Sequence, residues 1–517
     1  MAAIKTSKTK YIFVTGGVVS SIGKGTTCAS IGALLQSRGY AVHIRKFDPY
    51  LNTSAAMSPL THGEIYVTAD GHETDLDLGY YERFLGIKLS RDDSVSGGRI
   101  YYEVLDAERT GKYHNQNVQM IPHVSDKIKE YMGKRVKNGN ADFVICEIGG
   151  TVGDIEGQIF LEAARQMAYD LGRKNTMFVH LTLAPYIAAA DELKTKPTQQ
   201  SVRILLEKGV MADMLIVRTP RMLTPDERKK IGLFCNVAPE FVISGTDMDN
   251  IYKIPLAYDA QNVADRISEH FNLPKKKGDL AKFQKIAAYL AAKNPAAEIA
   301  VVGNYFGNQD AYKSLSEALF HAGYVNKARV NIRKVPAETL GKISAAELKK
   351  TFAQAAGILV TDGADEGEAA GKTAAARFAR ENAIPYLGIG AGAFAAADDF
   401  LKNVCGAREA SGAIGSMRRG EFPCKIKTGT LAHKIYKEQT VSERHRHSYE
   451  LNMKHKAALE KFGMIISGVS PDGKFPEILE IPKHPFFIAA TFNPELQSSP
   501  FTSHPLFAAF IRAAMKK

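Results

Sequence analysis

The segment of residues 11–27 constrains the fold of this chain more than any other part of it. An apolar, β-prone run (Tyr11–Thr15) breaks into a glycine-containing loop, and Gly23-Lys24-Gly25 then opens an amphipathic helix that we expect from Cys28 to Gln36. This order directs backbone N–H groups and a helix N-terminus at an anion, with Lys24 within reach of the outer phosphates. The pattern predicts an α/β domain that binds a nucleoside triphosphate.

The loop departs from the usual Walker A pattern in two ways. It is one residue longer, and Gly25 stands where a serine or threonine normally ligates magnesium. Taken alone, the loop is therefore also compatible with an ordinary glycine-rich turn.

Length, cysteine usage and charge narrow the class of protein. A chain of 517 residues is too long for one ordinary core, so two or three domains are expected. Five scattered cysteines without a Cys-x-x-Cys pair, no long apolar run and no signal-peptide core at the start predict a cytoplasmic protein away from membranes. The net charge of +12 comes without a basic block or an aromatic platform. We therefore expect polyanionic small substrates and no nucleic acid.

Strand-like runs alternate with helical patterns in two series. The first series contains Tyr11–Thr15, Ala41–Lys46, Phe143–Glu147, Thr176–Leu183, Met214–Arg218 and Phe241–Ser244. The second contains Glu298–Val302, Gly357–Thr361, Pro385–Ile389 and Phe486–Thr491, with alanine-rich helices at 345–356, 369–376 and 391–397. Alternation of this kind predicts mostly parallel sheets wrapped by helices.

A connector separates the two series. Proline, glycine and like charges at Leu273–Gly278 favour a surface segment, and a short helix is expected at Asp279–Ala292. The predicted organisation is a domain at 1–273, a linker at 274–297 and a domain at 298–517.

Carboxylates that could serve a phosphate-bound metal lie at two places. Asp75 and Asp77 follow a glycine-containing turn, and Glu147 ends an apolar strand. An acid at the carboxyl end of a sheet strand beside a phosphate loop is placed as a magnesium ligand, and magnesium needs only one or two carboxylates. Asp77 and Glu147 would suffice; the alternative makes Asp75 and Asp77 turn or capping residues.

The chain resembles CTP synthases over nearly its whole length. The matching segments are Thr15–Gly25, Lys46–Tyr50, Met57–Pro59, His62–Glu64, Glu73–Gly79, Glu147–Glu156, Lys194–Gln199, Lys229–Asn236, Asp310–Ser314 and Glu443–His447. The resemblance implies a P-loop-type, dethiobiotin-synthetase-like amidoligase domain with a parallel sheet, then a class I glutamine-amidotransferase-like α/β domain. It also implies a homotetramer.

The resemblance implies an ATP-driven amination. ATP would phosphorylate O4 of the UTP uracil, and ammonia would displace phosphate at C4 to give CTP. Lys24 and Lys46 would act as catalytic cations on the moving phosphoryl group, and Asp77 and Glu147 would hold Mg²⁺.

The resemblance also assigns the binding positions. ATP would be bound by Ser21, Ile22, Gly23, Lys24, Gly25, Thr26, Asp77, Arg218, Thr246, Asp247 and Met248. UTP would be bound by Ser20, Lys194, Thr195, Lys196, Pro197, Thr198, Gln199 and Lys230, and the feedback inhibitor CTP by Asp154, Ile155 and Glu156. Without the family, the three lysines of the UTP set would be interpreted as a solvated face.

The second domain departs from the family's glutaminase pattern. That chemistry needs a cysteine on a strand-to-helix elbow, a histidine base, an orienting glutamate and backbone oxyanion donors. Here Gly390 stands at the nucleophile position, Asn493 replaces the histidine, Glu495 has no base to orient, and Asp362-Gly363 replaces a Gly-Gly turn. Because neither Cys405 nor Cys424 lies on an elbow, we predict that the glutaminase is inactive.

Further departures touch regulation and the acceptor site. The acidic segment Ala364–Gly371 lies where the family carries an arginine associated with GTP activation, which argues against that activation. Arg444 and Arg446 are consistent either with a relic glutamine site or with structural ion pairing. Asn52–Met57 is a residue shorter than its counterpart and lacks its acid. This difference is either a change of acceptor or nitrogen donor, or a tolerated loop variation.

Three functional hypotheses follow. The leading one is amination of UTP with free ammonia or another small amine. The second is amination of a different pyrimidine nucleotide, or use of an unusual nitrogen donor in a specialised pathway. The third is a non-catalytic regulatory paralogue, against which the retained Lys24, Lys46, Asp77 and Glu147 argue.

Overall fold

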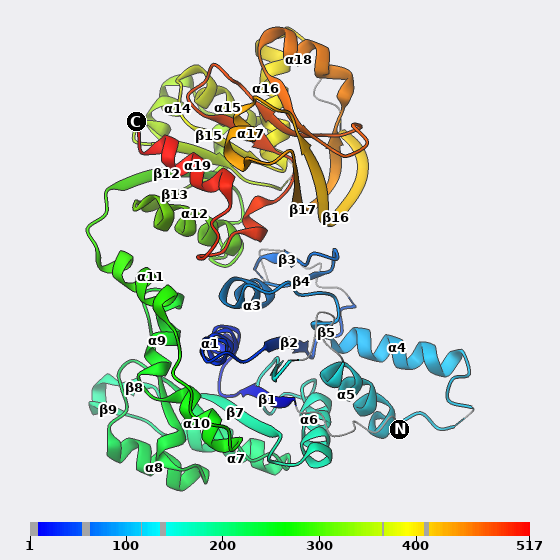
Figure 1. The fold of residues 1–517 in the computed structure, drawn as a ribbon, viewed down its shortest axis with the longest axis vertical. Coiled ribbons are helices and arrows are strands. Elements are labelled where there is room, and N and C mark those ends of the chain that lie inside the picture. Colours follow the sequence, from blue (N-terminus) through cyan, green and yellow to red (C-terminus); the bar gives the residue numbers. More distant parts are fainter. Residues whose placement is uncertain are drawn as a thin grey trace. The chain divides into compact units, whose positions relative to one another are not determined.

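The chain forms two compact units. The computed structural model describes residues 9–53, 63–114, 116–134, 141–363, 367–407 and 413–516 (Figure 1). The first unit holds the described residues up to 53 together with 80–288, and the second holds 63–79 together with 289–516. The family segment Met57–Pro59, His62, most of Asn52–Met57 and residues 364–366 lie outside the described residues.

A parallel sheet organises the first unit. Its strand order is β11-β10-β7-β1-β6-β2-β5, and every neighbouring pair is parallel. The strands are β1 (Lys10–Gly16), β2 (Val42–Asp48), β5 (Ser94–Ser96), β6 (Phe143–Ile148), β7 (Thr176–Leu183), β10 (Met214–Thr219) and β11 (Val242–Thr246). All strands predicted for this region are confirmed. The edge strand β5 was not predicted, because three residues with two serines carry no apolar signal.

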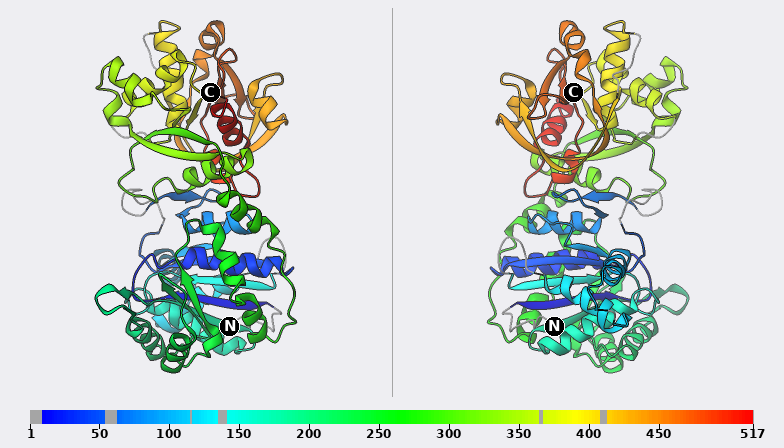
Figure 2. Two further views of the ribbon diagram at one scale, coloured as in Figure 1. Left: turned by 90° about the vertical axis from the view of Figure 1, so that its left-hand side faces the viewer. Right: turned by 90° about the vertical axis from the view of Figure 1, so that its right-hand side faces the viewer.

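Helices cover both faces of this sheet, as buried parallel sheets require. They are α1 (Lys24–Ser37), α4 (Gly97–Arg109), α5 (Ser125–Gly133), α6 (Gln158–Leu171), α7 (Lys196–Glu207), α8 (Pro225–Cys235), α9 (Ile254–Asp259), α10 (Val263–His270) and α11 (Ala281–Ala291). Phe13, Phe47 and Val144 pack in one core with α5, α6 and α7, whereas Gly32 of α1 packs near Ile44 on the opposite face. The ribbon views show α1 on one side of this sheet and α6 on the other (Figures 1 and 2). A small hairpin, β8 (Tyr186–Ile187) and β9 (Glu192–Leu193), precedes α7.

The second unit contains a mixed sheet in the order β13-β12-β14-β15-β20-β19-β18-β16-β17. The parallel part is β12 (Ala296–Gly303), β13 (Arg329–Pro336), β14 (Gly357–Val360), β15 (Tyr386–Ile389) and β20 (Phe487–Ala490); the antiparallel part is β16 (Ala413–Ile426), β17 (Thr440–Leu451), β18 (Ile465–Val469) and β19 (Pro476–Glu480). The predicted strands are present, and β13 and β16–β19 were missed.

Helices flank the second sheet as well. They are α12 (Lys313–Asn326), α13 (Ala337–Leu340), α14 (Ala345–Phe352), α15 (Ala369–Glu381), α16 (Ala391–Asn403), α17 (Leu431–Tyr436), α18 (Lys456–Phe462) and α19 (Pro505–Ala514). The alanine-rich stretches 369–376 and 391–397 are helical, as predicted, and the stretch 345–356 is helical up to Phe352. Among the described helices, none is long and apolar enough to cross a membrane.

A hairpin from early in the chain belongs to the second unit. Strands β3 (Ile65–Val67) and β4 (Glu73–Asp75) pair antiparallel, and α3 (Asp77–Leu85) follows. Glu64 accepts hydrogen bonds from the backbone N–H and hydroxyl of Ser314. Polar contacts of this kind group residues 63–79 with the C-terminal half, although they precede the predicted boundary.

Arg444 and Arg446, whose role the sequence did not decide, form hydrogen bonds with this hairpin. Arg444 donates to the Tyr66 hydroxyl at 2.8 Å and to the Val67 carbonyl at 3.0 Å. Arg446 Nε donates to Glu73 Oε1 at 3.1 Å. Structural pairing therefore accounts for both side chains in this structure.

Candidate active sites

The phosphate-binding loop connects β1 to α1. Gly23 is the N-cap residue of α1, with a left-handed conformation (φ 95°), and no side chain caps the helix. The helix begins at Lys24, earlier than the predicted Cys28, so the loop glycines lie directly at its N-terminus. Uncapped N–H groups and the helix dipole make this end a site for an anion.

The Lys24 side chain extends past Gly16, at the start of this loop. Its Nζ atom donates to the carbonyl of Gly150 at 2.9 Å. A Cβ on Gly16 would lie 3.0 Å from Lys24 Cδ, so the missing side chain leaves room for the lysine. A neutral carbonyl is a weaker partner for an ammonium group than a phosphate oxygen, so a nucleotide could displace it.

Lys46 and Glu147 form a buried ion pair on neighbouring strands. The two residues lie opposite each other in the β2–β6 register, and Lys46 Nζ is 3.2 Å from Glu147 Oε1. Lys46 is 5% exposed and Glu147 is 1% exposed. The Tyr81 hydroxyl donates to Glu147 Oε2, and Asp48 Oδ1 lies 3.6 Å from Lys46 Nζ. Glu147 also lies beside Val14 of β1, two residues before the phosphate loop.

Asp75 and Asp77 occupy the turn before α3. The Asp75 carboxylate accepts from the backbone N–H of Asp77 at 3.2 Å, which fits the turn-residue interpretation of Asp75. Asp77 is the first residue of α3 and is grouped with the second unit. Its pairing with Glu147 at a metal stays a prediction.

The donor chemistry of Glu147 suits magnesium. No group of three or more histidine, cysteine, aspartate or glutamate side chains within the described residues is arranged to hold a metal. Magnesium bound to nucleotide takes most of its ligands from phosphates and water, with one or two carboxylates. A single buried carboxylate at a strand end is compatible with that requirement.

The positions assigned to adenine binding lie at the ends of β10 and β11. Arg218 forms an ion pair with Asp247, and Thr246 is the last residue of β11. Met248 is largely solvent-accessible for an apolar side chain, at 37%. An exposed methionine beside an arginine offers an apolar and a cationic contact to a heterocycle.

The positions assigned to UTP divide into accessible and structural side chains. Lys196 and Lys230 are exposed on α7 and α8, and Lys194 pairs with Glu192. Thr198 instead donates to the Leu183 carbonyl at 3.0 Å, and Gln199 Nε2 donates to Thr195 Oγ1 at 3.1 Å. Ser20 is exposed in the phosphate loop, and Pro197 occupies the first turn of α7.

The positions assigned to CTP feedback form an exposed turn after β6. Asp154 accepts from the Thr151 N–H at 3.1 Å, and Ile155 is 83% exposed. Glu156 is exposed beside them.

A buried histidine behind the phosphate loop was missed by sequence reasoning. His180 of β7 interacts through Nδ1 with Thr15 Oγ1 at 2.8 Å and through Nε2 with Ser201 Oγ at 2.7 Å. Burial lowers its pKa to about 3, with the Lys24 charge as a smaller cause. Its signal was a histidine within an otherwise apolar strand, and its neutral ring joins the loop strand to α7.

Gly390 lies on a strand-to-helix elbow between β15 and α16. It adopts φ 53° and ψ −113°, and its N–H donates to the Ala490 carbonyl at 2.8 Å. A Cβ on Gly392 would lie 2.5 Å from the Val360 carbonyl oxygen, so close approach of the helix to the sheet requires a glycine there. The elbow geometry is present without a nucleophile.

The Asp362 carboxylate fills the space in front of this elbow. A Cβ on Gly390 would overlap Asp362 Oδ1 and Cγ and would lie 2.8 Å from Asp362 Cβ. Oδ1 accepts from the backbone N–H of Ala391 at 3.0 Å. In an elbow of this kind that N–H is an oxyanion donor, and here a fixed anion occupies it.

Asn493 and Glu495 lie on the other side of Asp362. Asn493 Nδ2 donates to Glu495 Oε1 at 3.1 Å and lies 3.4 Å from Asp362 Oδ2. Asn493 Oδ1 accepts from the Arg446 N–H at 2.9 Å. Because an amide does not titrate near neutral pH, Asn493 cannot act as a general base.

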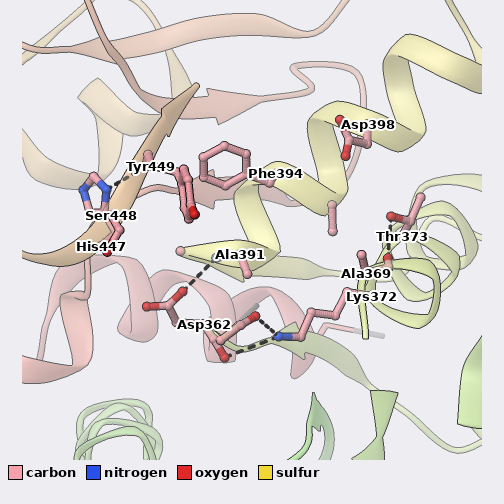
Figure 3. Close-up of a pocket in the computed structure, with 13 residues that line it drawn as sticks. Asp362, Ala369, Lys372, Thr373, Ala391, Phe394, Asp398, His447, Ser448 and Tyr449 are labelled. Carbon is pink, nitrogen blue, oxygen red and sulfur yellow. Dashed lines mark hydrogen bonds between the residues drawn. The ribbon is translucent and has the colours of Figure 1, made fainter. Parts of the chain in front are cut away.

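A cavity of about 340 Å³ adjoins the elbow (Figure 3). Asp362 and Lys372 lie at one end of it, and Phe394 and Tyr449 at the other. Lys372 pairs with Glu368 at 2.8 Å and donates to the Gly363 carbonyl. Gly363 adopts φ 106°, as a backbone turn after β14. The pocket is therefore ligand-sized, with its lysine already paired.

Neither free cysteine of this unit is activated. Burial raises the pKa of the Cys405 thiol, and burial together with Glu477 raises the pKa of Cys424. Cys405 follows α16 and Cys424 lies within β16, away from the elbow. A thiol with a raised pKa is a poor nucleophile.

Comparison with known proteins places both halves. The family described as "CTP synthase N-terminus" matches residues 10–273, and "Glutamine amidotransferase class-I" matches residues 308–513. The chain belongs to the CTP synthase family.

Its relatives match along their whole lengths. A CTP synthase of Paramagnetospirillum magneticum is 46% identical over 98% of this chain and 99% of the relative, and that of Zymomonas mobilis is 47% identical with the same coverage. The solved glutaminase domain of Trypanosoma brucei CTPS with bound acivicin is 32% identical over 43% of this chain and 94% of that chain, with a TM-score of 0.40. The predicted fold, an N-terminal CTP synthase domain with a parallel sheet and a class I amidotransferase domain, is confirmed for this family member.

Proposed function

We propose that this CTP synthase family member converts UTP to CTP with ATP, and that it uses free ammonia or another small amine instead of glutamine. The observation that carries the second part is the Asp362 carboxylate, which lies in front of Gly390 and accepts the Ala391 N–H. Nucleophile, base and oxyanion donor are all unavailable to a glutamine amide. The recognised amidotransferase fold would then serve another purpose than hydrolysis.

The synthetase half retains what phosphoryl transfer needs. The uncapped α1 terminus and Lys24 would bind the ATP phosphates, and Lys46 would neutralise charge on the phosphoryl group that moves to O4 of UTP. Glu147 and Asp77 would hold Mg²⁺, which supplies charge neutralisation between the phosphates when bound. Arg218, Thr246, Asp247 and Met248 would contact the adenine end, and the exposed Lys196 and Lys230 the UTP phosphates.

Retention of these groups disfavours a purely regulatory role. The buried Lys46–Glu147 pair carries a large desolvation penalty, and a chain without catalysis gains nothing specific from keeping both charges at a strand end. We also propose a homotetramer, CTP feedback at Asp154–Glu156 and no GTP activation. A changed nucleotide acceptor rests only on the short segment Asn52–Met57, most of which lies outside the described residues.

The proposal is tested by supplying ATP, UTP and Mg²⁺ with either ammonium chloride or glutamine. We expect CTP from ammonium alone, with a rate that rises with pH as free ammonia increases. Glutamine-driven turnover equal to ammonium-driven turnover would refute it. A Lys24→Ala variant should make no CTP from either nitrogen source, and it therefore controls for a contaminating CTP synthase.

A further inference from the structure

A second cavity of about 230 Å³ lies beside Asp362, within the second unit, and is lined by three carboxylates. They belong to Glu64, Asp362 and Glu495, which come from three distant parts of the chain. Thr361, Tyr305, Tyr312, Asn493 and Arg446 supply the other polar lining. The volume suits a small ion with a few waters.

The cavity lacks a cation for two of these carboxylates. Within the part of the chain that the structure describes, no lysine, arginine or histidine forms an ion pair with Asp362 or Glu495. Arg446 lines the cavity but pairs with Glu73 at 3.1 Å, and Lys372 pairs with Glu368 at 2.8 Å. Arg446 and Lys372 therefore already form ion pairs with other carboxylates.

Hydrogen-bond donors are also too few. The single Nδ2 group of Asn493 serves both Glu495 and Asp362. The Oε2 atom of Glu495 is buried and has no hydrogen-bond partner among the described residues. Buried carboxylate oxygens are normally satisfied, so this one indicates a missing hydrogen-bond partner.

We propose that this cavity binds ammonium, with Glu495 as the group that accepts its proton. The inference rests on the proposed use of free ammonia. Ammonium offers N–H donors in several directions and one positive charge, which is what Glu495 Oε2 and Asp362 lack. A proton passes from bound NH₄⁺ to the Glu495 carboxylate, leaving NH₃ and a neutral carboxyl, which later releases its proton to water.

The electrostatics of Glu495 match this role. Burial raises the pKa of its carboxyl to about 8, and the charges of Glu64 and Asp362 add to the effect. The free protein at neutral pH then carries a proton on Glu495, which ammonium binding displaces. In the bound pair the proton can reside on the ammonia nitrogen or on the Glu495 carboxylate at similar free energy. Neutral ammonia can therefore leave without a large barrier.

The kinetic test measures CTP formation against total ammonium from pH 6.5 to 9. In the wild type, kcat/KM for ammonium should rise and then level off near pH 8, where Glu495 ionises. In Glu495→Gln it should keep rising with free ammonia. The KM for ammonium near pH 8, where Glu495 ionises in the wild type, should increase about tenfold, with KM for ATP and UTP unchanged. Glu495→Asp should restore part of the plateau.

The matched control is Glu438→Gln, an exposed glutamate of the same unit. It should behave like the wild type. Identical ammonium profiles for wild type, Glu495→Gln and Asp362→Asn would overturn the proposal.

A binding test separates this inference from the activity. Rubidium, a cation of similar size to ammonium, should give an anomalous diffraction peak between Asp362 and Glu495, which ammonium chloride removes and Glu495→Gln abolishes. Absence of that peak overturns the site even if ammonia-dependent synthesis is observed. If the peak appears but the protein makes CTP from glutamine and not from ammonium, the cation site is confirmed and the proposed function is refuted.

Discussion

Asp362 and Ala391 are joined by a 3.0 Å hydrogen bond in which a carboxylate oxygen accepts the first N–H after the elbow glycine. The carboxylate stands where a tetrahedral oxyanion would otherwise be stabilised, and it also occupies the space of a side chain at Gly390. The glycine at position 390 and the position of the Asp362 side chain are therefore sterically coupled. Gly390 without the Asp362 side chain would leave an empty space in front of the elbow. Asp362 beside a larger residue at position 390 would overlap that residue.

This coupling predicts that restoring the nucleophile alone fails. Gly390→Cys should give no glutaminase and should lower the melting temperature, because its Cβ would overlap Asp362 and glycine is favoured at φ 53°. Gly390→Cys with Asp362→Gly and Asn493→His should react with a chloroketone analogue of glutamine, seen as a mass increase of the protein. Asp362→Gly alone is the control and should not react. Labelling of the Gly390→Cys single variant would show that Asp362 does not block the elbow.

The sequence predicted the sheets and the phosphate loop because periodic apolar runs and glycines are local signals. It missed β16 and β17, whose many polar and charged residues give no periodic apolar signal and pair only across the long hairpin. It also missed the attachment of residues 63–79 to the second unit, because the contacts of Glu64 with Ser314 and of Tyr66 with Arg444 join positions hundreds of residues apart. The glycine at position 390, the asparagine at position 493 and the replacement of a Gly-Gly turn by Asp362-Gly363 were readable from the sequence. The hydrogen bond from the Ala391 N–H to the Asp362 carboxylate was not.

The Lys46–Glu147 pair predicts separable effects on stability and catalysis. Lys46→Met should abolish CTP formation and should destabilise the first unit by about 3–5 kcal/mol, because it leaves Glu147 buried without its cation. The double variant Lys46→Met with Glu147→Gln should recover most of the melting temperature and none of the activity. Thermal unfolding and the ammonium-driven assay measure the two effects. Lys229→Met, on the exposed face of α8, is the control. Wild-type turnover in Lys46→Met would remove Lys46 from the mechanism.

His180 predicts acid sensitivity of the first unit. Its pKa falls to about 3 in the folded protein, from an ordinary 6.5, because burial disfavours the charged ring. The unfolded chain therefore binds an extra proton below pH 6.5, and stability should fall by about 1.4 kcal/mol per pH unit as pH decreases toward the folded pKa. Chemical unfolding between pH 4.5 and 7.5 measures this slope. His180→Gln should lose this part of the slope, whereas His433→Gln, a change at a half-buried histidine of the second unit, should keep it. Equal slopes in all three proteins would contradict the assignment.

Gly17 of the phosphate loop packs so closely against Ser201 of α7 that a side chain at position 17 would have no room. A Cβ there would overlap Ser201 Oγ and would lie 3.0 Å from Ser201 Cβ, while Ser201 Oγ is held by His180 at 2.7 Å. The φ of Gly17 is not positive, so the obstacle is steric and a smaller neighbour should relieve it. Gly17→Ala should therefore raise the KM for ATP and lower the melting temperature, because Ser201 must move and leave His180 with one partner. Ser201→Ala alone should be mild, and Gly17→Ala with Ser201→Ala should be more active than Gly17→Ala. A double variant worse than the sum of its parts would mean that the serine hydroxyl, and not the space it occupies, is what the loop needs.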